Sequence, residues 1–325
     1  MNPRLRSALF LVAAFVAPLV CVPFIVMPGE RHEGPLPALT DVQTDAALRI
    51  EATVHVLAGQ IGERNQHRAP EALVTAGEWI ERQLVAIFGR VDRQSFRTWK
   101  GEAFNIEARA VGQGSCVVVV GAHYDSAIGT PGADDNASGV GAMIELSRRF
   151  ATRPAPCATR WVAWTNEEQP WFQDEGQGSL EHARALRAEG VRVAAVYSLE
   201  TLGWYDDRES TQVYPFPMGL IYPSVGNFVA FVGDARNVRL VRASVASFRA
   251  NAPFPSEGVA APGWIPGITW SDHAAYSALG MPAVMVTDTA MYRNPAYHTA
   301  QDRTIDAARV ARVVDGLEAV IRATR

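Results

Sequence analysis

Hydrophobic residues recur along the chain in two distinct rhythms. At residues 73–88 and 310–321 they stand three or four positions apart, which predicts amphipathic helices. Shorter, continuous apolar runs are rich in β-branched and aromatic residues, which predicts strands buried on both faces. These runs are residues 117–120, 161–164, 193–197 and 283–286.

Further helical stretches, at residues 140–150 and 180–188, separate these strands. The alternation predicts an α/β fold with three layers, α/β/α, around a mostly parallel, mixed central sheet. Two stretches rich in proline and glycine, residues 214–227 and 253–267, predict long loops. Long loops in compact domains tend to be functional, so we expect these two near a site.

The N-terminal residues form a separate segment. Arg4 and Arg6 precede an uncharged stretch of 20 apolar or small residues, 8–27, which is about long enough to cross a bilayer core of roughly 30 Å. The pattern of small residues that marks a cleavage site is missing, which favours an uncleaved membrane anchor over a cleaved signal. A buried hairpin of the fold is the alternative, and Pro18 and Pro23 disfavour it.

The basic flank of this segment predicts a topology. It places the N-terminal side in the cytoplasm and the remaining chain on the periplasmic or extracellular face of a membrane. A cleaved segment would instead make the protein secreted. We therefore expect an anchor or signal at residues 1–28, a linker at 29–44 and one domain at 45–325.

Charge and cysteine content narrow the possible chemistry. The chain has 30 basic and 34 acidic residues and a net charge of −4, so nucleic acid is not an expected partner. Three cysteines cannot build a disulfide scaffold or a thiolate zinc site, so any metal must be held by histidine and carboxylate. Cys116 and Cys157 precede two predicted parallel strands, where they either form a disulfide in an oxidising compartment or remain two buried thiols.

Histidine and carboxylate residues follow three of the predicted strands. His123 and Asp125 follow the first of them. Glu167 and Glu168 follow the second, and Glu200 follows the third. Each could be structural by itself, as a core histidine or a solvated turn. In open α/β sheets, however, ligands bind at the carboxyl ends of the strands, so their coincidence at one edge predicts a site there.

Six short motifs lie at or after the predicted strand ends. They are His-Tyr-Asp-Ser at 123–126, Ala-Asp-Asp-Asn-Ala-Ser-Gly at 133–139, Asn-Glu-Glu at 166–168, Ser-Leu-Glu at 198–200, Ser-Asp-His at 271–273 and Tyr-His-Thr at 297–299. In this order and context they resemble the M28 zinc aminopeptidases, a family of co-catalytic zinc exopeptidases. The resemblance covers roughly residues 45–320 and implies a zinc-exopeptidase-like fold.

The resemblance also implies a site for two zinc ions per chain. His123 and Glu200 would complete one ion, Glu168 and His298 would complete the other, and Asp135 would bridge both. Neutral imidazole and carboxylate are suitable zinc ligands, and a shared carboxylate can hold two cations at the ~3.5–4 Å spacing that serves hydrolysis.

Further roles follow from the same resemblance. Glu167 would be the general base that takes a proton from water and passes it to the leaving amine. Asp125 stands two residues after His123, so it can accept the second ring N–H of that ligand, and the peptide bond after Asp135 is often cis in the family. Candidate substrate-binding residues are Asp272, His273, Tyr276 and Tyr297, although an N-cap of the next helix explains Asp272 nearly as well.

Two features differ from the family pattern or vary within it. Many members have Asp where this chain has Glu200, and the longer side chain could change how the first zinc is held. A loop at residues 169–178 carries Trp171 and Phe172, which either form a wall of the substrate pocket or cover apolar surface.

Three functions are compatible with these observations. The first is a metal-dependent exopeptidase that removes N-terminal residues from peptides. The second is an acyltransferase that resembles glutaminyl cyclase and uses one zinc. It shares the His-Tyr-Asp-Ser motif, but its relatives lack the Asp-Asp-Asn-Ala-Ser-Gly turn. The third is a non-catalytic binding ectodomain of the same fold, which the intact set of ligand positions disfavours.

Overall fold

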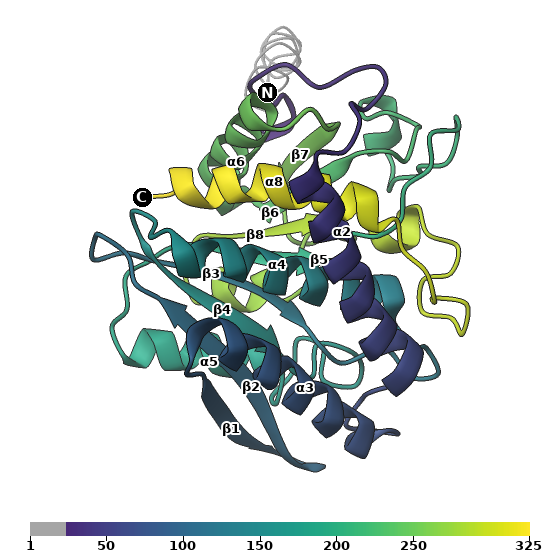
Figure 1. Cartoon of the computed structure of the whole chain (residues 1–325). Coiled ribbons are helices and arrows are strands. Elements are labelled where there is room, and N and C mark those ends of the chain that lie inside the picture. The colour runs from purple at the N-terminus through teal and green to yellow at the C-terminus, as the bar shows by residue number, and fades with distance from the viewer. Residues whose placement is uncertain (1–23) are drawn as a thin grey trace, which may run out of the picture.

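The computed structural model describes residues 24–325, and its elements surround one mixed sheet with the strand order β1-β2-β4-β3-β5-β8-β6-β7 (Figure 1). The strands are β1 (Asp92–Thr98), β2 (Gly101–Ala110), β3 (Val117–His123), β4 (Ala158–Trp164), β5 (Val193–Glu200), β6 (Val229–Asp234), β7 (Ser256–Ala261) and β8 (Ala283–Thr287). The helices are α2 (Asp41–Val54), α3 (Pro70–Phe88), α4 (Gly139–Thr152), α5 (Gly178–Ala188), α6 (Val238–Asn251), α7 (His273–Ala278) and α8 (Ala307–Ala323).

The centre of the sheet is parallel, as predicted. Strands β4, β3, β5 and β8 run parallel to one another. Strand β2 is antiparallel to both β1 and β4, and β6 is antiparallel to β8 but parallel to the edge strand β7. Val118, Val119 and Val120 of β3 are fully buried, and each contributes roughly 1.5–3 kcal/mol through its burial. The three-layer α/β fold is therefore confirmed.

Helices cover the two faces of the sheet unequally. On one face α2, α3, α4, α6 and α8 pack over a large apolar core (Figure 1). Gly316 of α8 has no side chain where it meets Phe248 of α6, so these two helices approach closely. On the other face α5 and α7 pack against β4, β3, β5 and the start of β8. Loops cover β6, β7 and the rest of β8 instead, around a smaller apolar cluster.

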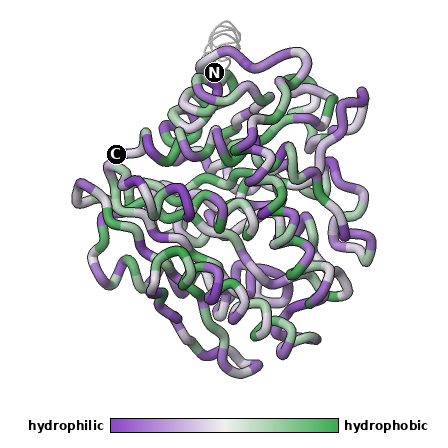
Figure 2. The backbone as a smooth tube through the Cα atoms, viewed as in Figure 1, coloured by the Kyte–Doolittle hydropathy of each residue, from purple (hydrophilic) through white to green (hydrophobic). Residues whose placement is uncertain are grey.

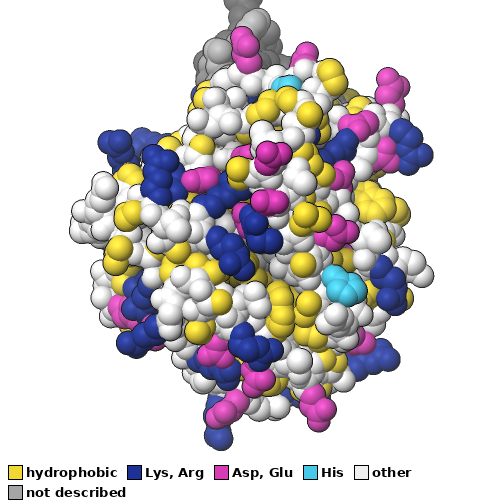
Figure 3. Space-filling view, viewed as in Figure 1, with side chains coloured by type: hydrophobic (Ala, Val, Ile, Leu, Met, Phe, Trp, Pro, Cys, Tyr) yellow, Lys and Arg dark blue, Asp and Glu magenta, His cyan; other side chains and the backbone are white. Residues whose placement is uncertain are grey.

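Hydropathy and charge follow this layering. Hydrophobic residues are frequent along the central strands, and hydrophilic residues along the peripheral loops (Figure 2). Basic and acidic side chains are interspersed on the face shown in Figure 3, without a large patch of one sign.

Two parts of the fold differ from the sequence-based expectation. Strand β7, Ser256–Ala261, lies inside the stretch that was expected to be a loop at 253–267. Its small residues carry little strand propensity, and its pairing with β6 comes from the tertiary fold. The antiparallel strands β1 and β2 were not predicted at all, because their burial is partial and their polar content is high.

The expected membrane segment falls mostly on residues 1–23, which lie outside the described residues. Among residues 24–325, no helix combines the length and apolar composition needed to span a bilayer. Helix α2 begins at Asp41, inside the expected linker, after a capping box between Thr40 and Gln43. The residues before it are also ordered on the domain, since Met27 is 8% exposed and packs beside Gly258 of β7.

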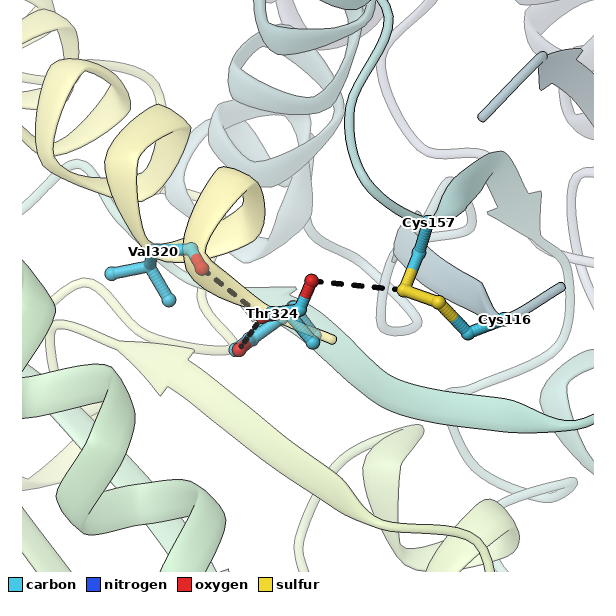
Figure 4. The surroundings of a disulfide bond; sticks show 5 residues. Cys116, Cys157, Val320 and Thr324 are labelled. Atoms are coloured by element: carbon cyan, nitrogen blue, oxygen red, sulfur yellow. Dashed lines mark hydrogen bonds between the residues drawn. A yellow bond between two sulfur atoms is a disulfide. The ribbon is translucent and has the colours of Figure 1, made fainter. Parts of the chain in front are cut away.

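Cys116 and Cys157 form a disulfide (Figure 4). Their Cα atoms are 4.8 Å apart, within the usual range for a bridge. The bond joins the residue before β3 to the residue before β4, at the opposite end of these strands from the predicted site. Of the two alternatives for these cysteines, the structure contains the bridge.

Candidate metal centre

The carboxyl ends of three adjacent parallel strands meet at one edge of the sheet. Strand β3 ends at His123 and β5 ends at Glu200, while Glu167 and Glu168 follow β4 after two residues. Asp135 comes from the turn Ala133–Ser138 that leads into α4. His298 lies in the segment between β8 and α8.

These side chains form two groups that share Asp135. In the first group the Nε2 atom of His123 lies 3.2 Å from Asp135 Oδ1 and 3.3 Å from Glu200 Oε1. In the second group His298 Nε2 lies 3.0 Å from Asp135 Oδ2 and 3.3 Å from Glu168 Oε2. Asp135 thus offers one oxygen to each group, and each group has three potential metal-ligand atoms within 4.8 Å of one another.

The chemistry of these residues fits zinc. Imidazole nitrogen and carboxylate oxygen are common zinc ligands, and three protein ligands leave a coordination position open, as catalytic sites require. Asp135 Oδ1 and Glu168 Oε1 are buried and accept no hydrogen bond. Buried carboxylate oxygens without donors are costly unless a cation satisfies them.

The turn that carries Asp135 is held by hydrogen bonds from several directions. Asp302 accepts hydrogen bonds from the backbone N–H groups of Asp134 and Asp135, at 2.8 and 3.1 Å. Asn136 accepts one from the N–H of Thr201 at 3.1 Å and donates one to Leu199 O at 2.8 Å, which ties the turn to β5. The peptide bond between Asp135 and Asn136 is cis, as the family resemblance implied.

Asp125 holds the turn after β4 against β3. Its two carboxylate oxygens accept hydrogen bonds from the backbone N–H groups of Glu167 and Glu168, at 3.1 and 3.0 Å. The Nδ1 atom of His123 lies 3.2 Å from the main-chain oxygen of Asp125 and 3.5 Å from its carboxylate. Asp125 therefore orients both the histidine and the Glu167–Glu168 pair.

Glu167 lies beside the first group, with Oε2 3.9 Å from His123 Nε2. Burial raises the pKa of Glu167 well above its usual value. His123 opposes this rise, and the nearby carboxylates of Glu200 and Glu168 add to it. A carboxyl group with a raised pKa suits a residue that must take up and release a proton.

The site concentrates negative charge. Burial raises the pKa of Glu168 to about 7 and also raises the pKa of Glu200. Burial would do the same to Asp135, but its interactions with His123 and His298 outweigh this and lower its pKa. Several carboxylates in one buried volume repel one another, and a divalent cation would remove this repulsion.

Glu200, the ligand position where the sequence was expected to depart from the family pattern, has a specific partner. The hydroxyl of Ser271 donates a hydrogen bond of 2.7 Å to Glu200 Oε2, which leaves Oε1 directed at His123. Ser271 precedes α7, and sequence reasoning had no signal for this contact because the two residues are 71 positions apart.

The four residues expected to bind substrate lie in different environments. Tyr297 lines an apolar pocket next to Glu200, and its ring stacks on His298 with the ring centroids 3.9 Å apart. Tyr276 is fully buried, and its hydroxyl lies 2.6 Å from His182 Nδ1. Tyr276 is therefore a core residue, contrary to the expectation that it lines the pocket.

Asp272 and His273 are also buried and absent from the lining of that pocket. His273 Nε2 lies 2.8 Å from the main-chain oxygen of Ile268, so this ring fixes the loop before α7. Asp272 is fully buried, and its side chain makes no capping hydrogen bond to α7. In this structure neither residue reaches the pocket surface.

The pocket draws on both stretches that were expected to be functional loops. Tyr214 and Met218 come from residues 214–227, and Pro266 comes from residues 253–267. The loop at 169–178 does not contribute to its lining. Trp171 is buried there against Trp99, with ring centroids 4.9 Å apart, so it covers apolar surface.

Comparison with known proteins identifies related sequences. Residues 105–321, more than half of the chain, match the model of peptidase family M28. The uncharacterized protein YfbL of Escherichia coli (strain K12) is 35% identical over 83% of this chain and 85% of its own length. A probable leucine aminopeptidase of the fungus Arthroderma benhamiae is 23% identical over 76% of this chain, which spans 65% of that longer protein.

A solved structure has the same fold. BSAP, a zinc aminopeptidase from Bacillus subtilis, superposes with a TM-score of 0.68 at 15% sequence identity. The match covers 85% of this chain and 94% of that one. At this level of identity the similarity establishes the fold.

Proposed function

The chain belongs to peptidase family M28, and from the geometry of its paired ligand groups we propose that it is a two-zinc aminopeptidase that removes N-terminal residues from peptides. One feature supports this activity above all. Asp135 places one oxygen in each of two groups of zinc-ligand atoms, with the buried carboxyl group of Glu167 beside them. This arrangement suits hydrolysis assisted by two metal ions.

The residues of the site have different roles in the proposed hydrolysis. Zinc bound at the two groups would polarise the scissile carbonyl and lower the pKa of water. Glu167 accepts the proton of the attacking water and returns it to the leaving amine. Asp125 keeps Glu167 in position through the backbone N–H, so that the carboxyl group is preorganised for this transfer.

Removal of an N-terminal rather than a C-terminal residue is supported by the names of similar proteins. The Arthroderma relative is named a probable leucine aminopeptidase, and BSAP is a zinc aminopeptidase. The pocket next to Glu200 is largely apolar, which is suited to the side chain of the terminal residue.

Zinc-dependent hydrolysis of leucyl-anilide by the purified full-length chain tests this function. We expect hydrolysis after zinc loading, its loss on treatment with a chelator, and its return on addition of zinc. N-terminally acetylated leucyl-anilide is the matched control, because an aminopeptidase requires a free amine. Hydrolysis of the acetylated substrate at the same rate would contradict the proposal. Cyclisation of N-terminal glutamine without peptide hydrolysis would favour the single-zinc acyltransferase.

We also propose that residues 8–27 anchor the protein in a membrane and that a single peptidase domain, 45–325, lies outside the cytoplasm. The uncharged length of this stretch and the preceding Arg4 and Arg6 support an anchor. The Cys116–Cys157 bridge is compatible with an oxidising compartment. Retention of the protein in membranes after an alkaline wash, together with cleavage of the domain by external protease, is the expected result. Release by the wash would contradict the anchor.

A further inference from the structure

Two loops that cover β6 and β7 expose large apolar side chains at their tips. Phe216 and Leu220, in the connection from β5 to β6, are 90% and 80% exposed, and Trp264, which follows β7, is 82% exposed. Behind these tips, Tyr214 of the first loop and Ile265 of the second pack on the same apolar cluster. The two loops are therefore neighbours, and Phe216, Leu220 and Trp264, here called the loop tips, present large apolar surfaces to solvent.

The two loops also carry no charge. Residues 210–228 and 258–271 contain no Asp, Glu, Lys or Arg, although 20% of all residues in the chain are charged. They contain aromatic residues instead, among them Trp264 and Trp270. Tryptophan and tyrosine are enriched at the interface between membrane and water, whereas an uncharged apolar surface is unfavourable in water alone. The composition of the loops therefore favours contact with lipid.

The N-terminal apolar stretch, residues 8–27, ends on the neighbouring edge strand. Met27 is buried, and its side chain fills the space beside Gly258 of β7. The guanidinium group of Arg242 in α6 donates a hydrogen bond of 2.5 Å to Val26 O. The last residues of the stretch are thus attached directly to the domain, without a spacer.

Strand β7 connects this attachment with the loops. The hydroxyl of Tyr222, which follows the tips of the first loop, donates a hydrogen bond of 2.9 Å to Gly258 O, so the loop and Met27 meet at the same residue. Figure 1 shows the N-terminal end of the described chain and the connection from β5 to β6 at the same end of the molecule as β7. The apolar pocket reaches this strand as well, since Glu200 and Gly258 both contribute to its lining.

The length of the apolar stretch determines how far the domain lies from a membrane. A helix that crosses a bilayer core of roughly 30 Å needs about 20 residues. This is the whole of residues 8–27. A bilayer that is spanned by the stretch therefore has its surface at Met27, and the loops beside Gly258 lie next to the lipid head groups.

We propose that the loop tips Phe216, Leu220 and Trp264 insert into the surface of the lipid bilayer that holds the N-terminal anchor. The proposal rests on the membrane anchor proposed above and adds a second membrane contact, on the peptidase domain itself. The anchor keeps the loops at a high effective concentration next to the bilayer, so a small gain from three apolar side chains is sufficient to hold the domain in one orientation. Because Tyr214 and Met218 of the first loop line the pocket, this orientation places the pocket beside the membrane.

A fluorescent label on a loop tip tests this contact in the full-length chain, reconstituted into phosphatidylcholine vesicles. Trp264→Cys carries the label, and Cys21→Ser removes the cysteine outside the disulfide. The matched control is Val111→Cys, which is 78% exposed after β2 and is separated from β7 by five strands, β4, β3, β5, β8 and β6. Lipids with a nitroxide near the head group should quench the label at 264 about threefold more than the label at 111, and aqueous iodide should quench it less.

Substitution of the loop tips tests whether apolar contact is the cause. With the label at Leu220→Cys, the pair Phe216→Ser and Trp264→Ser should reduce quenching by the lipid nitroxide about threefold or more. Zinc content should remain unchanged, because neither residue belongs to the pocket lining or to the ligand groups. Val111→Ser is the matched control and should leave the quenching as it is. Equal quenching in the paired variant and the control would overturn the proposal.

The outcomes separate the loop contact from the anchor and from other occupants. If iodide reaches the label at 264 as freely as the label at 111, the loops face water and the proposal is wrong. Shielding from iodide without quenching by the lipid nitroxide would mean that protein, such as a second copy of the chain, covers the loops, which also overturns it. Release of the protein by an alkaline wash removes the anchor, and quenching that returns when vesicles are added to the released protein would leave the loop contact standing. Retention after the wash without quenching removes the loop contact alone.

Discussion

The two ends of the apolar pocket, one at the metal centre and one at the edge strand β7, are stabilised by different interactions. At the metal end, buried polar groups such as Asp125, Asp302 and Asn136 hold the ligand-bearing turns through hydrogen bonds to the backbone. At the far end, apolar side chains from strands and loops pack against one another, and Glu257 of the edge strand pairs with Arg31 and Arg249. Hydrogen bonds fix atoms to within tenths of an ångström, as chemistry requires, whereas apolar packing tolerates changes of shape. Substitutions at the metal end should therefore abolish activity, while those at the far end should redirect it.

The largest effect is expected at Glu167. Glu167→Gln should lower kcat for leucyl-anilide by about 10³-fold while retaining zinc, because the amide cannot accept the proton of water. The matched control is Glu175→Gln in the same loop, whose side chain is 74% exposed and pairs with Arg184. Steady-state kinetics and elemental analysis provide both readouts. A Glu167→Gln protein with the native rate would remove the assignment of the base.

Removal of one ligand residue should affect zinc binding at one of the two ligand groups and leave the other group intact. His298→Ala should reduce bound zinc from two ions to one per chain and lower hydrolysis by roughly 100-fold or more, because Asp135 and Glu168 alone hold the second ion poorly. The exposed His67 is the control, and His67→Ala should keep two ions. Retention of both ions by His298→Ala would show that this residue is no ligand.

A smaller effect is expected where a residue acts through its neighbours. Asp125→Asn replaces one carboxylate oxygen by an amide N–H, so it can no longer accept hydrogen bonds from both Glu167 and Glu168. We expect zinc affinity to fall about 10- to 100-fold with the fold intact. Competition with a chelator of known affinity measures this change, and an unchanged affinity would limit Asp125 to a purely structural role.

These predictions concern residues that the sequence motifs already contained. The resemblance of six local motifs to the M28 zinc aminopeptidases was sufficient to propose the ligand positions. His123, Glu168 and Glu200 lie at or shortly after the ends of β3, β4 and β5, whereas Asp135 and His298 lie elsewhere and were proposed through the resemblance alone. The structure brings together all five residues proposed as ligands. The pocket could not be predicted in the same way, because its far end depends on β7, whose sequence Ser-Glu-Gly-Val-Ala-Ala has little strand character.

Contacts between distant residues account for the remaining differences. Arg31 and Glu257 are more than two hundred positions apart, and no local pattern indicates that they meet. Tyr276 was assigned to the pocket because of the resemblance to the family, but α7 turns that side chain toward Trp164 and His182 in the core. The orientation of α7 is set by packing, which the sequence alone does not reveal.

The far end should respond mildly to a loss of packing. Met218→Ala removes apolar contact from the loop that covers the pocket, at about 0.8 kcal/mol per buried methylene. We expect KM for leucyl-anilide to rise about fivefold, with kcat and zinc content unchanged. A loss of zinc in Met218→Ala would mean that the two ends of the pocket are not independent.

The smallest effect on activity is expected at the amino ends of β3 and β4, opposite the metal centre. Replacing both Cys116 and Cys157 by serine opens a bridge between residues 41 positions apart and should lower the free energy of unfolding by about 3–4 kcal/mol. Activity should remain within about twofold of the original at moderate temperature. Urea denaturation and leucyl-anilide kinetics measure the two quantities, and a large loss of kcat in the folded variant would show that this edge influences the metal centre.

The number of zinc ions bound per chain tests the central claim most directly. Elemental analysis of the full-length protein, after controlled zinc titration and dialysis, gives this number against protein concentration. The two ligand groups joined by Asp135 predict two tightly bound ions. A single ion would contradict the two-metal account and favour the acyltransferase chemistry, and a protein that binds none would be a binding domain that retains the residues of an enzyme.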